Sequence, residues 1–132
     1  MKPLLLASTS RFRKELLARL GLPFEAEAPD YAEIPVPGLD PGELALRHAL
    51  GKAQSLAALR PGRLVIGSDQ VAELDGELLG KPGSLEAASA QLEKMSGRTV
   101  WFHTGLALVR DGRAKAVCEP FGVTLRRLDP ED

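Results

Sequence analysis

Short apolar runs alternate with segments of helical period along the first half of the chain. Residues 4–7 and 64–68 are largely apolar, which predicts two buried strands. The serines after the first run are N-cap candidates for a helix over about residues 11–20, closed by Gly21. Asp40 opens a segment with an N-cap aspartate, a first-turn proline and a capping-box glutamate, which predicts a second helix to about residue 59.

The middle of the chain predicts a tight turn and a third helix. Residues 71–79 carry an Asp-Gly pair at their centre, which is typical of a hairpin turn. Ser84 is an N-cap candidate for a helix that stops at the Ser-Gly pair of residues 96–97. The third helix is therefore expected to follow a hairpin.

The remaining segments complete an α/β pattern. Residues 99–109 and 114–125 are rich in β-forming side chains and predict an antiparallel hairpin. The proline-rich residues 23–39 predict an extended or looped connection. Strands that alternate with helices and end in a hairpin indicate a mixed, twisted sheet flanked by helices. At 132 residues and 44% hydrophobic content, the chain is expected to form a single domain over residues 1–132.

Charge and composition narrow the function classes. Seventeen basic and eighteen acidic residues leave a net charge of −1, which disfavours nucleic acid and membrane surfaces as partners. The apolar runs are far shorter than the roughly 20 residues of a bilayer span, and the polar residues 8–14 argue against a signal peptide. The single cysteine, Cys118, excludes an internal disulfide. These features favour a cytoplasmic protein.

Asp69 is the first candidate for chemistry. It follows the second apolar run directly, so the pattern predicts a carboxylate at the end of a buried strand, where α/β proteins place their sites. Gly67 beside it would let a ligand approach closely. The alternative is that Asp69 only forms an Asx turn that ends the strand.

The start of the first predicted helix is a candidate phosphate site. Arg13 is on the face of the apolar stripe that runs from Leu16 to Leu20, so its side chain is expected to point inward. A helix N-terminus with Ser8, Ser10 and Arg13 would suit phosphate oxygens. Equally, the serines could be plain caps and Arg13 could pair with a surface carboxylate.

Two lysines are further candidates. Lys52 is on the stripe of its helix that should face the protein body, so it is expected to be paired there or to face a cavity. The alternative is that its side chain extends past the stripe to solvent. The neighbouring Gly51 weakens a helix and would be tolerated if something packs against its backbone. Lys81, in a Gly-Lys-Pro loop, is either a site residue or a solvated turn residue.

The sequence favours oxygen ligands over a histidine metal site. His48 and His103 are far apart in the chain, and the His and Cys spacing of a zinc site is missing. Asp69 and Glu33, together with substrate phosphates, would be enough for magnesium.

Several motifs follow one another in order along the chain. They are Leu6-Ala-Ser-Thr-Ser-Arg-Phe-Arg-Lys-Glu-Leu-Leu17, Glu33, Lys52-Ala53, Ile66-Gly-Ser-Asp-Gln70, Leu74-Asp-Gly76, Gly80-Lys-Pro82 and Met95-Ser-Gly97. This order resembles the Maf family of nucleoside triphosphate pyrophosphatases. The resemblance implies a Maf/ITPase-like fold and an enzyme that cleaves the α–β phosphoanhydride of a nucleotide with a divalent metal, Mg or Mn.

The resemblance also implies roles for individual residues. Asp69 would be the catalytic proton acceptor, and Glu33 and Asp69 would hold the metal. The substrate would be bound by Ser8, Ser10, Phe12, Arg13, Glu33, Lys52, Gln70 and Lys81.

Gln70 determines which branch of the family the chain resembles. Gly-Ser-Asp-Gln is similar to the branch that acts on 7-methyl-GTP, whereas Gly-Ala-Asp-Thr is typical of the branch that acts on dTTP and UTP. Phe12 and residues 102–106 fit the first branch. An aromatic ring could stack on a methylated, cationic base, a contact worth about 0.5–2 kcal/mol. The expected products are 7-methyl-GMP and diphosphate, and the alternative is a dTTP/UTP pyrophosphatase.

The chain departs from the family pattern in three places. Arg11 replaces a frequent proline, Ala32 stands where an aspartate often precedes the glutamate, and family chains usually continue for a further lobe beyond Asp132. The family fold is therefore expected to be shortened at the C-terminus. A missing lobe would favour self-association into a homodimer. It also leaves open a non-catalytic, nucleotide-binding role, for example in regulating cell division.

Overall fold

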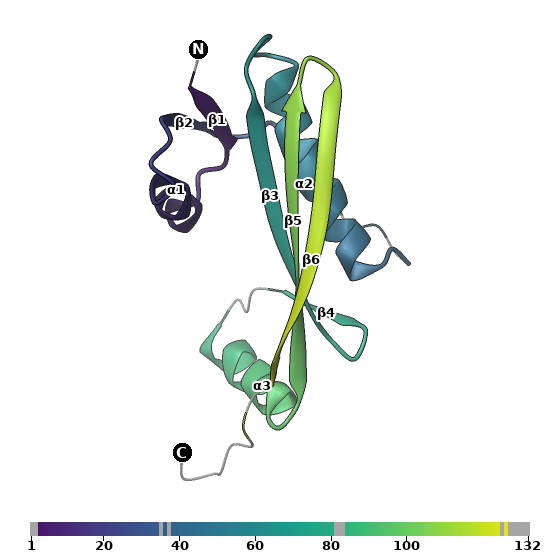
Figure 1. The fold of residues 1–132 in the computed structure, drawn as a ribbon. Coiled ribbons are helices and arrows are strands. Elements are labelled where there is room, and N and C mark those ends of the chain that lie inside the picture. The colour runs from purple at the N-terminus through teal and green to yellow at the C-terminus, as the bar shows by residue number, and fades with distance from the viewer. Residues whose placement is uncertain (1–2, 35, 37, 81–83, 125, 127–132) are drawn as a thin grey trace.

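A computed structural model describes residues 3–34, 36, 38–80, 84–124 and 126 (Figure 1). Within them, helices and strands alternate as the sequence predicts. In chain order they are β1 (Leu4–Ala7), α1 (Arg11–Ala18), β2 (Phe24–Glu27), α2 (Pro41–Ala57), β3 (Val65–Leu74), β4 (Glu77–Leu79), α3 (Leu85–Met95), β5 (Thr99–Arg110) and β6 (Arg113–Thr124).

One mixed sheet connects all the strands. Its order is β2-β1-β3-β5-β6, with β4 paired to the far end of β3. β1 is parallel to both β2 and β3, whereas the β3–β4, β3–β5 and β5–β6 pairs are antiparallel. The predicted α/β class with a mixed sheet flanked by helices is confirmed.

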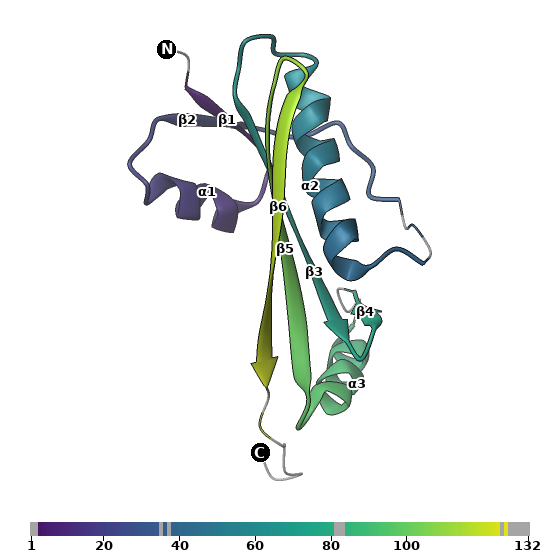
Figure 2. The same cartoon turned by 45° about the vertical axis from the view of Figure 1, so that its right-hand side comes forward.

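The strand order reverses at β1. The chain leaves β1 through α1 to reach β2 on one side, and then passes through α2 to reach β3 on the other side. Figure 2 shows α1 and α2 on opposite faces of the sheet. Such a reversal opens a crevice at the carboxyl end of the central strand, where open α/β sheets bind ligands.

The parallel part of the sheet is short at this point. β1 pairs with β3 only through Leu5 with Val65 and Leu6 with Ile66. β1 then ends at Ala7, while β3 runs on to Leu74 beside β5. Between Ile66 and Ala72, where the pairing with β4 begins, this edge of β3 is thus left open toward the loop that leads into α1.

Helix α2 forms the core against the other face of the sheet. Its predicted inward stripe is confirmed, because Ala45, Ala49, Ala53 and Leu56 are all buried. The fit depends on glycine. An ideal Cβ on Gly67 would lie 2.2 Å from the carbonyl oxygen of Ala49, and one on Gly105 would lie 2.5 Å from that of Ala45.

Two expectations about β3 were wrong. Asp69 does not end the strand, because β3 continues through it and pairs Asp69 with Gly105 in a ladder that runs on to Glu73. Gly67 does not leave room for a ligand, because the backbone of α2 occupies that space. After Gly67 the strand carries polar side chains: Asp69 contacts Lys52 of α2, and Ser68 and Gln70 line a cavity on the other face.

Helix α1 differs from its predicted form in length and burial. It ends at Ala18 rather than near residue 20, and Gly21 follows at a φ of 73°. Its apolar stripe was expected to face the protein body, yet Leu16 and Leu20 are 44% and 66% exposed. The stripe faces an open cavity instead.

Strand β2 was expected only as an extended or looped connection. Its Phe-Glu-Ala-Glu sequence lacks the apolar character of a buried strand, because β2 lies at the edge of the sheet. Both of its glutamates bind arginines of the loop before β3: Glu25 pairs with Arg63 at 2.9 Å and Glu27 with Arg60 at 3.1 Å. Edge strands commonly carry such charges.

The other local predictions agree with the structure. Asp40 and Ser84 are the N-caps of α2 and α3, and β5 and β6 form the predicted hairpin. Within the described ranges, no helix is both long enough and apolar enough to cross a membrane.

Replacing Gly67 by alanine should destabilise the fold. The added methyl group would overlap the α2 backbone, so we expect Gly67→Ala to lower the free energy of unfolding by about 1–3 kcal/mol or more. Urea denaturation measures this change. Gly80→Ala is the matched control, since a Cβ there meets open space, and it should change stability by less than about 0.5 kcal/mol. Equal effects of the two substitutions would contradict this account of the packing.

Candidate functional site

A buried lysine joins two carboxylates at the centre of the candidate site. The Lys52 Nζ atom lies 2.5 Å from Glu33 Oε1 and donates a hydrogen bond of 3.0 Å to Asp69 Oδ1. Three segments meet here: the loop after β2 carries Glu33, α2 carries Lys52, and β3 carries Asp69. Lys52 is therefore paired inside the protein and does not extend to solvent.

Asp69 faces α2 because side chains alternate along β3. Gly67 and Asp69 lie on the face that α2 covers, while Ser68 and Gln70 lie on the opposite face. The Asp69 residue is only 7% exposed. Burial raises the pKa of its carboxyl group, although the ammonium group of Lys52 partly offsets this rise.

Glu33 contacts the same lysine, but its pKa shifts in the opposite direction from that of Asp69. Its hydrogen bond and charge interaction with Lys52 lower its pKa, because its side chain is still half exposed and loses less hydration. The pKa values of the two carboxyl groups therefore shift in opposite directions for structural reasons. The rise at Asp69 increases its affinity for a proton, which a group that accepts a proton needs.

The serine-rich loop after β1 is folded by its own hydroxyl groups. Ser8 Oγ accepts a hydrogen bond from the backbone N–H of Ser10 at 2.9 Å, and Ser10 Oγ caps α1 by accepting one from the N–H of Arg13 at 3.3 Å. Ser8 is buried beside the end of β1. The serines thus act as turn and cap residues, and their hydroxyl hydrogens stay available to a ligand.

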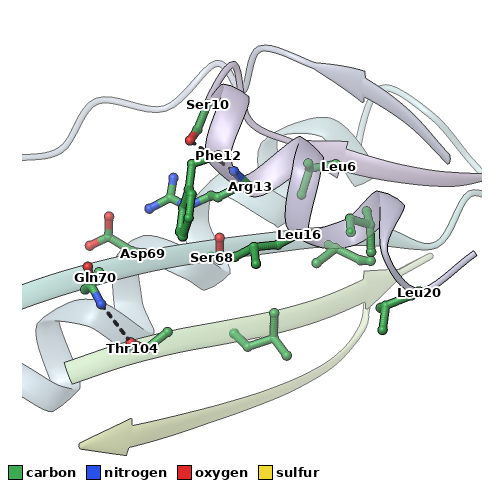
Figure 3. A pocket seen from close by; sticks show the side chains of 13 residues that line it. Leu6, Ser10, Phe12, Arg13, Leu16, Leu20, Ser68, Asp69, Gln70 and Thr104 are labelled. Atoms are coloured by element: carbon green, nitrogen blue, oxygen red, sulfur yellow. Dashed lines mark hydrogen bonds between the residues drawn. The ribbon is translucent and has the colours of Figure 1, made fainter. Parts of the chain in front are cut away.

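A cavity of about 610 Å³ lies on the α1 side of the sheet. This volume is within the usual range for small-molecule sites. Figure 3 shows Phe12 and Arg13 extending from α1 toward Asp69 and Gln70 on β3. The side chains that line it come from β1, α1 and the residues next to α1, β3 and β5: Leu6, Ser10, Phe12, Arg13, Leu16, Leu17, Leu20, Ile66, Ser68, Asp69, Gln70, Thr104 and Leu106.

Polar groups lie at one end of this cavity and apolar groups at the other. Gln70 Nε2 donates a hydrogen bond of 3.3 Å to Thr104 Oγ1 across the β3–β5 pair. Leu16 of α1 and Leu20, which follows the helix, lie at the other end (Figure 3). Asp69 both lines the cavity and contacts Lys52, so it connects the cavity with the charged cluster.

The structure brings together most of the residues predicted for the site. Glu33, Lys52 and Asp69 form the charged cluster, whereas Ser10, Phe12, Arg13 and Gln70 line the cavity. Ser8 lies in the loop between them. Lys81 falls outside the described residues, so its predicted role is left without a structural position.

Two residues at the site were not predicted as site residues. Thr104 is the hydrogen-bond partner of Gln70, and its position opposite Gln70 depends on the β3–β5 register, which sequence alone does not give. Tyr31 packs on Gly51 and bonds to His48. Its only sequence signal is the glycine within a helix, which indicated that something packs against the backbone there.

The carboxylate oxygens of Glu33 and Asp69 are potential ligands for a metal ion. Within the described part of the chain, no group of three or more His, Cys, Asp or Glu residues could hold a metal by itself. Glu33 and Asp69 nevertheless direct oxygens to one point, where they meet the Lys52 ammonium. Magnesium commonly uses one or two carboxylates together with substrate phosphates, so these two residues fit such an ion.

Cys118 does not belong to this site. It is a half-buried thiol on β6, outside any disulfide. Burial, followed by the charges of Asp40 and Glu119, raises its pKa, which keeps the thiol protonated and unreactive.

The crevice at the strand-order reversal has Arg13 and Asp69 in its lining, and Lys52 is paired with Asp69 beside it. Such a crevice is typical of an α/β protein that binds a small ligand. A family model described as "Maf-like protein" matches residues 3–132. The chain therefore belongs to the Maf family.

Three curated relatives of the chain share one name. Proteins named 7-methyl-GTP pyrophosphatase match from Bordetella pertussis (57% identical over 109 residues, 83% of this chain and 54% of that protein) and Pseudomonas syringae (52% over 131 residues, 98% and 68%). A third, from Chromobacterium violaceum, is 54% identical over 127 residues, which are 95% of this chain and 66% of that protein. The chain thus spans about half to two thirds of the length of these relatives.

Removing each carboxylate should change the pH dependence of stability in opposite directions. The folded-state pKa of Glu33 lies below its ordinary 4.5, so its stabilising effect is present above that pH and is lost as pH falls through the folded pKa. The folded-state pKa of Asp69 lies above its ordinary 3.8, so the fold loses stability as pH rises from there through the folded pKa.

Urea denaturation from about pH 3.5 to pH 7 measures both effects. The stability difference between wild type and Glu33→Gln should grow with rising pH. The difference between wild type and Asp69→Asn should shrink. Slopes of the same sign would contradict the opposite pKa shifts.

Proposed function

We propose that this chain hydrolyses the α–β phosphoanhydride of 7-methyl-GTP and releases 7-methyl-GMP and diphosphate. The observation that carries the proposal is the buried Asp69 carboxylate, which lines the cavity at the β1 crevice and is held by Lys52. The names of the relatives support the choice of substrate.

Asp69 acts as the general base in this proposal. Its raised pKa increases its affinity for a proton, and its Lys52 contact fixes the carboxylate. A water oxygen bonds to the α-phosphorus, the bond from this phosphorus to the oxygen that bridges it to the β-phosphorus breaks, and Asp69 takes a proton of the water. Diphosphate then leaves with the bridging oxygen.

Cationic and hydroxyl groups around the crevice bind the phosphates. Arg13 lines the cavity from α1, Lys52 lies beside Asp69, and Ser8 and Ser10 can donate their hydroxyl hydrogens. Such donors stabilise the negative charge that develops on the phosphate oxygens and the leaving group. Lys81 belongs to this set as a prediction from sequence.

A divalent ion, Mg or Mn, fits the same cluster. Glu33 and Asp69 would hold it, because their carboxylate oxygens already converge on one cation, the Lys52 ammonium. When bound, such an ion would neutralise part of the charge on the substrate phosphates. Lys52 would then be free to turn toward a phosphate oxygen.

The base of the nucleotide occupies the cavity on the α1 side. Phe12 offers an exposed ring for stacking, and the Gln70–Thr104 pair offers polar atoms for recognition of the base edge. A methylated guanine carries a positive charge, which strengthens its attraction to an aromatic face. Gln70 and Phe12 are therefore the specificity residues of the proposal.

The domain organisation, the cellular compartment and the oligomeric state of the protein are part of the same proposal. We propose one Maf-like domain that acts in the cytoplasm on free nucleotides, which the near-neutral charge and the single cysteine support. The exposed apolar side chains of α1, including Phe12 and Leu16, would also support a homodimer.

Asp69→Asn should lower pyrophosphate release by at least about 100-fold, because the general base is removed while the shape is kept. The assay supplies 7-methyl-GTP, GTP, dTTP or UTP with magnesium or manganese and measures pyrophosphate. Asp75→Asn is the matched control. It lies in the exposed β3–β4 turn and should leave the rate unchanged.

Each outcome of this assay has a clear meaning. Release from 7-methyl-GTP that disappears with Asp69→Asn supports the proposal. Release confined to dTTP and UTP would overturn the argument from Gln70. Nucleotide binding without release from any substrate would indicate a non-catalytic binding protein.

Phe12→Leu should weaken recognition of the methylated base selectively. Leucine keeps an apolar side chain but lacks the aromatic face, so a contact of about 0.5–2 kcal/mol is lost. The KM for 7-methyl-GTP should rise about 2- to 30-fold, with little change for GTP. Equal increases for both nucleotides would remove Phe12 from this role.

A further inference from the structure

Glu33 belongs to a segment without regular structure. Residues 28–34 follow β2 directly and form neither helix nor strand. A side chain on such a segment is placed accurately only if neighbouring contacts anchor the backbone. The question is what holds Glu33 over Lys52.

The ring of Tyr31, two residues before Glu33, packs against α2 at Gly51. An ideal Cβ on Gly51 would lie 2.2 Å from Tyr31 Cε2 and 2.7 Å from Cζ. Real side chains do not reach such distances, so glycine is required for the ring to occupy this position. The helix accepts a residue that weakens it, and the space gained is filled by Tyr31.

The hydroxyl of the same tyrosine is also fixed. Tyr31 Oη and His48 Nδ1 lie 2.7 Å apart in a hydrogen bond, and the two rings meet edge to face with their centroids 5.6 Å apart. His48 is only 6% exposed, so its ring is itself held by the core. Tyr31 is thus fixed by both packing and hydrogen bonding.

The three α2 residues involved are neighbours on the helix surface. His48 and Lys52 are four residues apart and lie one turn from each other, with Gly51 beside them. Tyr31 contacts His48 and Gly51, and Glu33 contacts Lys52. Two alternate residues of the loop therefore contact one continuous strip of α2.

We propose that Tyr31, Gly51 and His48 form a latch whose task is to hold Glu33 against Lys52. In this arrangement Tyr31 and Gly51 are positioning residues. Neither is among the residues that line the cavity, and they act through the backbone that leads from Tyr31 to Glu33. The part of the proposal that concerns metal binding and rate rests on the function proposed above.

The latch can be tested without any enzymatic activity. The pKa of Glu33 reports its contact with Lys52, because that contact is the main cause of its lowered value. A chain labelled with ¹³C-glutamate gives carboxyl NMR signals that follow pH, and Glu33→Gln identifies the signal of Glu33. Lys52→Met is the positive control and should raise the pKa of Glu33.

Gly51→Ala and Tyr31→Ala should both raise the pKa of Glu33 toward its ordinary 4.5. Tyr31→Phe keeps the ring and should give an intermediate value. Gly80→Ala, a glycine substitution into open space, should leave the pKa of Glu33 unchanged. If Gly51→Ala acts only by displacing the ring, adding it to Tyr31→Ala should cause no further shift.

Three results would overturn the latch. The first is an unchanged Glu33 pKa in both Tyr31→Ala and Gly51→Ala. The second is no response to Lys52→Met, which would mean that the Glu33–Lys52 pair does not form in solution. The third is additive shifts in the double variant. If Gly51→Ala does not fold, as far-UV circular dichroism would show, Tyr31→Ala and Tyr31→Phe decide the matter.

Activity adds an independent readout. If wild type releases pyrophosphate, Tyr31→Ala should raise by several-fold the metal concentration that gives half-maximal rate, with Tyr31→Phe between it and wild type. A purely structural role would lower stability without changing this concentration. If wild type is inactive, the proposed function fails, while the NMR titration still decides whether the latch exists.

Discussion

The site depends on the close packing of the α2 backbone against the sheet. Gly67 and Gly105 lie on adjacent strands and admit the helix backbone at carbonyl oxygens one turn apart, those of Ala49 and Ala45. Side chains at either glycine would push the helix away. Because the helix lies this close to the sheet, Lys52 of α2 is within hydrogen-bonding distance of Asp69 on β3. Close backbone packing thus fixes the position of a charged pair, and the alanines of α2 supply apolar contact without adding bulk.

The sequence was most informative where structure is local. Asp40 and Ser84 cap their helices because the capping hydrogen bonds involve residues only two or three positions away. The β5–β6 hairpin is likewise defined by its own turn. Strand β2 was missed because edge position, and not apolar pattern, determines its composition. The extent of β3 was underestimated because its second half is stabilised by pairing with β5, which lies about 30 residues further along the chain.

The same distinction applies to the site. Residue chemistry and family resemblance identified Glu33, Lys52 and Asp69, and the structure brings these three together. Their roles in catalysis and metal binding are still predictions. The pattern could not decide whether Lys52 is paired or solvated, because that depends on the distance between α2 and β3. It also gave no sign of Tyr31, although Gly51 marked the place where another group approaches the helix.

Lys52 gives the protein a cation of its own between two acidic groups. A structural zinc site usually needs its metal in order to fold, because the free energy of metal binding contributes much of the free energy of folding. Here the ammonium group already offsets the repulsion between Glu33 and Asp69, so their meeting does not depend on an ion from solution. Any metal that enters must compete with a tethered side chain that never diffuses away. The affinity of the site for metal is therefore set partly by how easily Lys52 finds another anion, and a bound phosphate is the natural one.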